Sequence, residues 1–154
     1  MFSTKLSVSI HILSVIACME GKSLTSEFIA GSIGTNPVLV RRLMGRLKKA
    51  DLLVTKTKVG VIGIGRDLDK ITLLDIFLAV EDDCEVFGIH TSANPACPIG
   101  AEIETVLTYF YQDLEASFYK KLSETTLSDI TNRLYKPSFK TGEFPVQTIG
   151  KEII

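Results

Sequence analysis

The stretch I-G-T-N-P at residues 33–37 constrains the fold of this chain most, because it ends one helix and begins the next. The residues just before it have the apolar spacing of a short helix. Gly34 closes that helix, since glycine adopts a left-handed conformation without a Cβ penalty. Thr35 or Asn36 then caps a second helix with Pro37 in its first turn, where the missing N–H has no helical partner. Two helices joined so tightly predict a helix-turn-helix.

The second helix has an apolar inner stripe and a basic outer face. The stripe consists of Val40, Leu43, Met44 and Leu47. From Asn36 to Lys58 the basic residues are Arg41, Arg42, Arg46, Lys48, Lys49, Lys56 and Lys58, against the single acid Asp51. Residues 1–66 carry a net charge of +7 and residues 67–154 a net charge of -8, within a chain total of -1. Such a local basic face suits a polyanion such as DNA, and a merely solvated helix face is the alternative.

A glycine-rich hairpin follows the basic helix. Residues 52–55 have a strand-like composition, and V-G-V-I-G-I-G at residues 59–65 alternates β-branched residues with glycine. Lys58 falls near the predicted tip. A helix-turn-helix followed by a hairpin is a winged helix, so residues 1–82 are predicted to form a mostly α domain with a small β-hairpin wing.

The acidic half of the chain contains two further helical segments separated by a loop. Thr72 and Asp75 have the spacing of a capping box at the start of a helix. Residues 83–98 are polar and contain Gly, Asn and Pro, which predicts a sensor-like loop. Beyond them, the apolar positions Ile103, Val106, Leu107, Phe110, Leu114 and Phe118 keep helical spacing. We expect residues 99–134 to form dimerisation helices, and a helix packed on its own winged helix is the alternative.

The composition of the chain and its cysteines indicate its state of assembly and its cellular compartment. Hydrophobic residues make up 45% of the chain and the mean hydropathy is +0.26, which suits burial between subunits. The three cysteines form no C-x-x-C pair, so a reducing cytoplasm is the simplest compartment. Residues 6–19 resemble the signal of an exported lipoprotein ending at Cys18, but their spacing also fits a buried helix, and we expect no membrane segment. Residues 135–154 are expected to form a flexible tail.

Four stretches resemble the bacterial Rrf-type winged-helix regulators, the group of IscR, NsrR and CymR, and among them the cluster-free YwnA-like branch. The stretches are S-T-K-L-S-V-S-I-H-I-L at residues 3–13, T-N-P-V-L-V-R-R-L-M-G-R-L-K-K-A-D-L-L at 35–53, D-K-I-T-L-L-D-I-F-L-A-V-E at 69–81, and N-P-A-C-P-I-G at 94–100. The second and third stretches are the most specific, and the resemblance covers about residues 3–134.

The resemblance implies a homodimeric repressor that places one recognition helix in each of two major-groove half-sites of a double-stranded DNA operator. The base-reading positions that it implies are Asn36, Val38, Arg41 and Arg42. Arginine can donate two hydrogen bonds to guanine, and valine can touch a thymine methyl. The implied phosphate contacts are Thr4, Lys5, Thr35 and Lys49, with Lys58 of the wing near the minor groove.

The cysteines of the loop depart from the pattern of cluster-binding relatives, where three cysteines recur at regular intervals. Cys97 matches the last of these positions, Cys84 lies one residue off the first, and Thr91 stands at the middle. With His90 the loop offers at most three ligands, whereas a thiolate-held cluster usually takes four. We therefore expect no iron–sulfur cluster, no metal and no other cofactor.

Cys97 directly precedes a predicted helix, and a helix N-terminus lowers the pKa of a thiol. Cys97 and Cys84 are therefore candidate redox-sensing residues, and an inert cysteine at position 97 is the alternative. A small-molecule effector or a partner enzyme is a further candidate partner. The chain has no nucleophile–base pair or phosphate loop, so we expect no enzyme. A winged-helix adaptor that binds protein in place of DNA is the alternative function.

Overall fold

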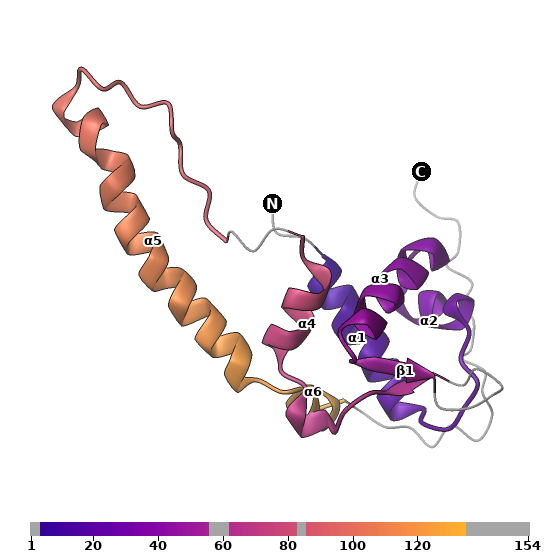
Figure 1. The fold of residues 1–154 in the computed structure, drawn as a ribbon. Helices are drawn as coiled ribbons and strands as arrows, with labels where there is room; N and C mark the ends of the chain where they lie inside the picture. Colours follow the sequence, from indigo (N-terminus) through magenta and orange to yellow (C-terminus); the bar gives the residue numbers. More distant parts are fainter. Residues whose placement is uncertain (1–3, 56–61, 83–85, 135–154) are drawn as a thin grey trace, which may run out of the picture.

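The computed structural model describes residues 4–55, 62–82 and 86–134 of the chain. Figure 1 shows a body of short helices with a two-stranded hairpin and one long helix that leaves it. The elements in chain order are α1 (Lys5–Cys18), α2 (Ser26–Ile33), α3 (Pro37–Lys49), β1 (Leu53–Thr55), β2 (Ile62–Ile64), the 3-10 helix η1 (Leu68–Lys70), α4 (Leu73–Val80), α5 (Pro98–Glu124) and α6 (Leu127–Thr131). The predicted winged helix-turn-helix class is confirmed.

The turn between α2 and α3 has the predicted chemistry. The Thr25 side chain accepts a hydrogen bond from the Phe28 N–H and caps α2. Gly34 ends this helix with φ 73°, in the left-handed region that favours glycine. Asn36 then caps α3, because its side chain accepts a hydrogen bond from the Val38 N–H. These local bonds fix the angle at which α3 leaves α2.

The end of α3 is closed by two backbone hydrogen bonds in the pattern of a Schellman motif. The Leu52 N–H donates to the Leu47 carbonyl at 2.9 Å, and the Asp51 N–H donates to the Lys48 carbonyl at 3.1 Å. Asp51 has φ 56° and is the residue in the left-handed region, where glycine is the usual occupant. The chain then turns directly into β1.

The hairpin is antiparallel, with Leu53 opposite Ile64 and Thr55 opposite Ile62. Gly65 passes so close to the α3–β1 turn that a Cβ at this position would clash with the Asp51 carbonyl oxygen. The predicted tip of the wing, including Lys58, lies outside the described residues.

The core lies between α1 and the other elements of the body. Its fully buried side chains come from every α-helix of the body. They are Ile12, Leu13 and Ile16 of α1, Ile29 of α2, Val40, Leu43 and Leu47 of α3, Ile76 and Val80 of α4, and Leu127 of α6, with Leu52, Leu53 and Ile71 beside them. The stripe predicted for α3 is buried in full, so its basic face is turned outward.

Helix α6 packs on this body, although we expected it to belong with the dimerisation element. The Leu127 N–H donates to the Ile71 carbonyl at 2.8 Å, and the Leu73 N–H donates to the Thr125 carbonyl at 2.9 Å. The predicted capping box of Thr72 is present at the start of α4. A second box at Thr126 starts α6, and the sequence analysis missed it. The two boxes lie side by side, because Thr72 and Thr126 form an antiparallel bridge.

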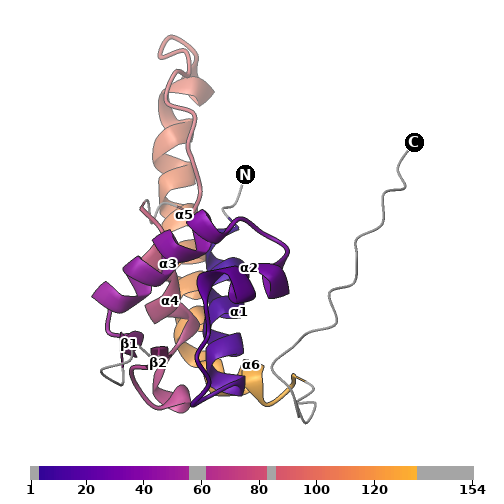
Figure 2. The same ribbon diagram turned by 90° about the vertical axis from the view of Figure 1, so that its right-hand side faces the viewer.

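Helix α5 projects well beyond the body in both views (Figure 1, Figure 2). None of its residues is buried. Its C-terminal half lies against α4, where the Phe77 ring is 5.8 Å from the Phe118 ring centroid and 6.0 Å from that of Tyr119. In the single chain most of α5 therefore does not pack along its own winged helix, and its role in dimerisation stays a prediction.

Candidate DNA interface

The start of α3 presents an exposed surface made of one apolar and two basic side chains. Val38 is 61% exposed, whereas the inner stripe of the same helix is buried. Arg41 and Arg42 follow on the same outer side and are also exposed. Lys48 and Lys49 continue the exposed basic charge in the last turn of the helix. A helix with these side chains on its outer face can enter a DNA groove and contact both base edges and phosphates.

Asn36, predicted to read bases, has a structural role at the same time. Its Oδ1 accepts the Val38 N–H at 2.8 Å, so the amide oxygen is occupied by the helix cap. The Nδ2 group is the part of this side chain that remains for a base or a phosphate.

Arg41 and Arg42 are consecutive residues of α3 but differ in their surroundings. The Nη1 group of Arg41 lies 2.7 Å from Oε1 of Glu27 and donates to the Ser26 hydroxyl at 3.0 Å, so α2 holds this guanidinium. Arg42 has no such partner within residues 4–55, 62–82 and 86–134. Sequence analysis did not identify the role of Glu27, because its partner lies 14 residues away on another helix.

The predicted phosphate contacts are spread over the body. Thr4 and Lys49 are exposed and Thr35 is half-buried beside the turn between α2 and α3. Lys5 is engaged in ion pairs, with its Nζ 2.9 Å from Oδ2 of Asp82 and 3.7 Å from Oε2 of Glu81.

Asp82 is the centre of a charged cluster that the sequence analysis missed. Its Oδ1 lies 2.7 Å from Nη1 of Arg46, and Lys5 binds its other oxygen. Arg46 also donates to the Val80 carbonyl at 2.8 Å. The hydrogen bonds from Arg46 and then from Lys5 lower the pKa of the Asp82 carboxyl from 3.8 to about 2. The cluster joins α1, α3 and the end of α4.

Cys97 lies at the N-cap of α5 and is exposed. The backbone N–H groups of Gly100 and then Ile99, in the first turn of α5, lower the pKa of its thiol. Cys84 lies outside the described residues.

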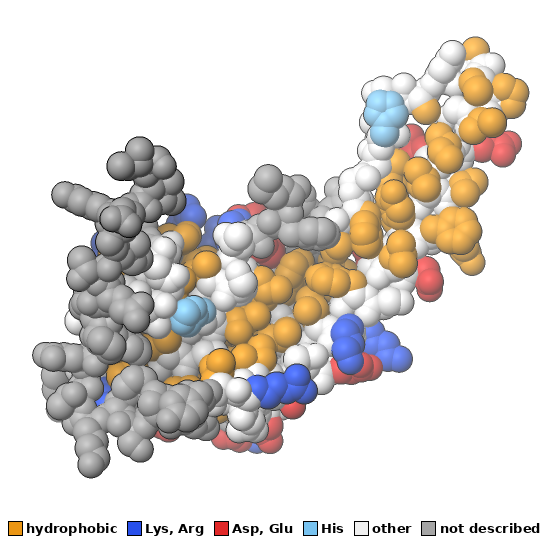
Figure 3. Space-filling view, turned by 180° about the vertical axis from the view of Figure 1, so that it is seen from behind, with side chains coloured by type: hydrophobic (Ala, Val, Ile, Leu, Met, Phe, Trp, Pro, Cys, Tyr) orange, Lys and Arg blue, Asp and Glu red, His pale blue; other side chains and the backbone are white. Residues whose placement is uncertain are grey.

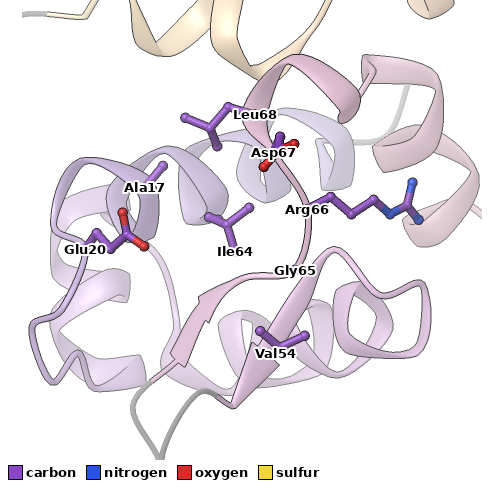
Figure 4. A pocket seen from close by; sticks show the side chains of 8 residues that line it. All are labelled: Ala17, Glu20, Val54, Ile64, Gly65, Arg66, Asp67 and Leu68. Carbon is purple, nitrogen blue, oxygen red and sulfur yellow. The ribbon is translucent and has the colours of Figure 1, made fainter.

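A hollow of about 510 Å³ opens between the end of α1, the hairpin and η1 (Figure 4). The Arg66 side chain points away from the other lining residues, and its guanidinium donates to the Ala50 carbonyl at 2.8 Å. Glu20 and Asp67, the other charged residues of the lining, are both acidic. This hollow therefore does not suit a phosphate group.

Comparisons with known proteins agree with the winged-helix fold. Residues 2–133 match the family model described as "Rrf2: Iron-dependent Transcriptional regulator". The chain is 38% identical over 135 residues to the "Putative HTH-type transcriptional regulator YwnA" of Bacillus subtilis (strain 168), covering 88% of this chain and all of that protein. A crystal structure of a "putative DNA binding protein" is 35% identical and has a TM-score of 0.65, with 83% of this chain and 99% of that chain covered.

A more distant solved structure shows the fold alone. It is that of CymR, the global cysteine regulator of B. subtilis, at 20% identity and a TM-score of 0.65, covering 88% of this chain and 98% of that chain.

The family description names iron, but the part of the chain that the structure describes offers no set of iron ligands. That part holds no group of three or more His, Cys, Asp or Glu side chains placed to bind a metal ion. Cys97 and His90 are both exposed loop or cap residues without such neighbours. The described residues therefore do not fit an iron centre.

None of the described helices is long and apolar enough to cross a membrane. The chain has a winged-helix fold with an outward basic face on α3. Residues 2–133 match a family of transcriptional regulators. The chain belongs to the Rrf2 family and is a DNA-binding transcriptional regulator.

Proposed function

We propose that the protein is a homodimeric repressor in which α3 of each subunit reads one half-site of a double-stranded DNA operator. The observation that carries this proposal is the division of α3 into two faces. Its inner stripe is fully buried, whereas Val38, Arg41 and Arg42 at its start are exposed on the outer face. A buried stripe fixes the helix rigidly, and the exposed residues are of the types that contact base edges.

Within this proposal Arg41 and Arg42 donate to guanine and Val38 touches a thymine methyl. Asn36 contributes its Nδ2 group, since its Oδ1 caps the helix. Backbone phosphates are bound by Thr4, Thr35 and Lys49, by Lys58 of the wing, and by Lys5 once it is shared between a phosphate and Asp82. These contacts set the register of the helix on the duplex.

The second subunit covers the apolar face of α5. Ile99, Ile103, Val106, Phe110 and Leu114 lie on one side of this helix and are all exposed. Figure 3 shows hydrophobic side chains along α5 that continue over the adjoining part of the body, and Leu78 of α4 is exposed as well. Single exposed apolar residues are common on protein surfaces, but a continuous apolar face of this kind marks an interaction site. The same helix of a second copy matches this face in length and chemistry. A two-fold dimer then predicts an inverted repeat in the operator, with half-sites about one or more helical turns apart.

The remaining assignments follow from this arrangement. Residues 1–82 with α6 form the DNA-binding domain, residues 83–98 form the loop where a signal acts, and α5 forms the dimerisation element. The protein acts in the cytoplasm, by occupying its operator, and has no catalytic step. The signal is an oxidant acting on Cys97, a small-molecule effector or a partner enzyme.

The test begins with selection of bound sequences from random duplex DNA by the full-length protein. An inverted repeat should be enriched, and its affinity should fall steeply as salt rises, with a logarithmic slope of about 0.9 per phosphate contact. Arg42→Ala should weaken binding by about 1–3 kcal/mol and relax the preference at one base pair. Arg133→Ala, which removes an exposed charge after α6, is the matched control.

Two outcomes would overturn the proposal. Enrichment of no DNA sequence would favour the adaptor function. Activation of a reporter that carries the selected site in its promoter would exclude repression.

A further inference from the structure

The guanidinium of Arg41 is held by two groups of α2. Its Nη1 lies 2.7 Å from Oε1 of Glu27 and donates to the Ser26 hydroxyl at 3.0 Å. Ser26 in turn donates to Oε2 of Glu27 at 3.1 Å, so the three side chains form a closed set of hydrogen bonds. The hydroxyl is thus acceptor and donor at once, and the carboxylate has both of its oxygens engaged.

These contacts decide which edge of Arg41 is left for a ligand. Nη1 carries two N–H groups, and it has two acceptors, one on Glu27 and one on Ser26. The N–H groups of Nε and Nη2 have no acceptor among the residues that the structure describes. Guanine offers two acceptors, O6 and N7, to a fork of two donors in the major groove. The edge formed by Nε and Nη2 is such a fork.

Glu27 is well placed to remain charged. It lies in the first turn of α2, where the helix dipole favours a negative charge. A hydrogen bond from its own backbone N–H, followed by that from Ser26, lowers the pKa of its carboxyl, and Arg41 lowers it further. The two helices are also fixed to one another, since Ile29 of α2 and Val40 of α3 are fully buried in one core.

Stability is a poor explanation for this ion pair. The Arg41 and Glu27 side chains are 53% and 64% exposed. Pairs this exposed contribute little to folding, because water screens the charges and ordering two long side chains opposes the gain. The pair is better explained by its effect on where the guanidinium points.

We propose that Glu27, assisted by Ser26, is a positioning residue that orients Arg41 so that its free edge selects guanine at one base pair of the half-site. The inference rests on the proposed function, in which α3 reads base edges. Arginine loses rotamer freedom when it binds a base, and a side chain that is already oriented loses less of it on binding. Glu27 itself does not touch DNA in this arrangement.

The opposite role for Glu27 is that of a competitor, which holds Arg41 away from DNA until a phosphate displaces it. The two roles predict changes of opposite sign. A positioning residue loses affinity and base preference when it is replaced. A competitor gains affinity for all sequences when it is replaced, and the salt dependence becomes steeper because Arg41 then pairs with a phosphate.

The experiment is sequence selection followed by affinity measurements on every single-base variant of the selected site. The proteins are the full-length wild type, Arg41→Ala, Glu27→Ala, Glu27→Gln, the double variant Glu27→Ala with Arg41→Ala, and Asp69→Asn. Asp69→Asn removes an exposed acid of η1 and controls for the change in net charge. Circular dichroism and thermal melting confirm that each variant is folded.

Glu27→Ala should lower affinity for the selected site by about tenfold and abolish the guanine preference at the same base pair that Arg41→Ala affects. Glu27→Gln keeps an acceptor for Arg41 and should retain part of that preference. The double variant should be no worse than Arg41→Ala alone, since the two residues act through one contact. Asp69→Asn should leave every base preference unchanged.

An unchanged preference profile for Glu27→Ala, or a uniform gain in affinity, would overturn the inference and leave the proposed function standing. If the wild type selects no sequence at all, the proposed function fails and the positioning role fails with it.

Discussion

Arg46 of α3 and Asp82, the second residue after α4, form an ion pair with 2.7 Å between Nη1 and Oδ1. The pair joins the basic helix to the point where the chain leaves the body for the loop that leads to α5. Lys5 of α1 binds the other carboxylate oxygen at 2.9 Å. One carboxylate therefore fastens the start of the loop to two helices of the DNA-binding domain.

We expect this cluster to make the stability of the fold decrease at acidic pH. The pKa of Asp82 is about 2 in the folded protein and 3.8 ordinarily, so the ionised form favours folding. Its contribution is fully present above pH 3.8 and is lost as the pH falls toward 2. Thermal melting between pH 5 and about 2 should show a shallower loss of Tm for Asp82→Asn than for the wild type. Asp113→Asn, at an exposed position of α5, is the control and should keep the wild-type slope.

Asp51→Gly should stabilise the fold. Asp51 ends α3 in the left-handed region, with φ 56°, and glycine adopts this conformation without a Cβ penalty. The free energy of unfolding, measured with urea, should rise by on the order of 0.5–1 kcal/mol. This figure is a net gain, because the greater freedom of glycine in the unfolded chain opposes the relief of the Cβ penalty. Asp51→Asn removes the same charge and tolerates the same conformation, so it should change stability less. An equal gain for both variants would assign the effect to charge.

Two substitutions on α3 should separate folding from DNA binding. Leu43 is fully buried, so Leu43→Ala should lower the free energy of unfolding by about 2–5 kcal/mol. Val38 is 61% exposed, so Val38→Ala should change it by less than about 0.5 kcal/mol. Val38→Ala should nevertheless weaken DNA binding, because the shorter side chain loses its contact with a thymine methyl. A large loss of stability for Val38→Ala would contradict the outward orientation of this side chain.

Phe110→Asp should weaken the dimer. Phe110 is 58% exposed in the single chain and lies in the middle of the apolar face of α5. Burial of one such side chain contributes about 1.5–3 kcal/mol, and a carboxylate at a dry interface opposes association further. Analytical ultracentrifugation should show dimers for the wild type and a shift toward monomers for the variant.

Gln112→Asp adds the same charge at an exposed position of the same helix and controls for charge alone. A wild type that is monomeric at micromolar concentration would exclude α5 as the dimerisation element.

Cys97 should react faster with iodoacetamide than an ordinary thiol at pH 7. The N–H groups of Gly100 and Ile99 lower the pKa of its thiol, and the thiolate is the reactive form. Mass spectrometry across a pH series should place the midpoint of its alkylation below that of a free cysteine. Cys97→Ser identifies the signal that belongs to this residue. If alkylation leaves DNA binding unchanged, the residue is reactive but is not the sensor.

Much of the helix-turn-helix could be predicted, because its determinants are local. Gly34 is needed for the turn, Asn36 caps α3 two residues ahead of its bonding partner, and Thr72 with Asp75 caps α4. Each bond lies within a few residues of sequence, so the pattern that encodes it is visible in a short window. The buried stripe of α3 was predicted for the same reason, since helical periodicity alone specifies a face.

The sequence alone thus determined the helices of the body, the turn between α2 and α3 and the separation of a basic from an acidic half. Only the tertiary structure decided which charges meet. Lys5 and Asp82 lie 77 residues apart in sequence, and Arg41 and Glu27 lie on different helices. It also placed α6 on the core and left the face of α5 uncovered. Such pairings depend on the packing of buried side chains, which brings distant residues together, and no local pattern records that geometry.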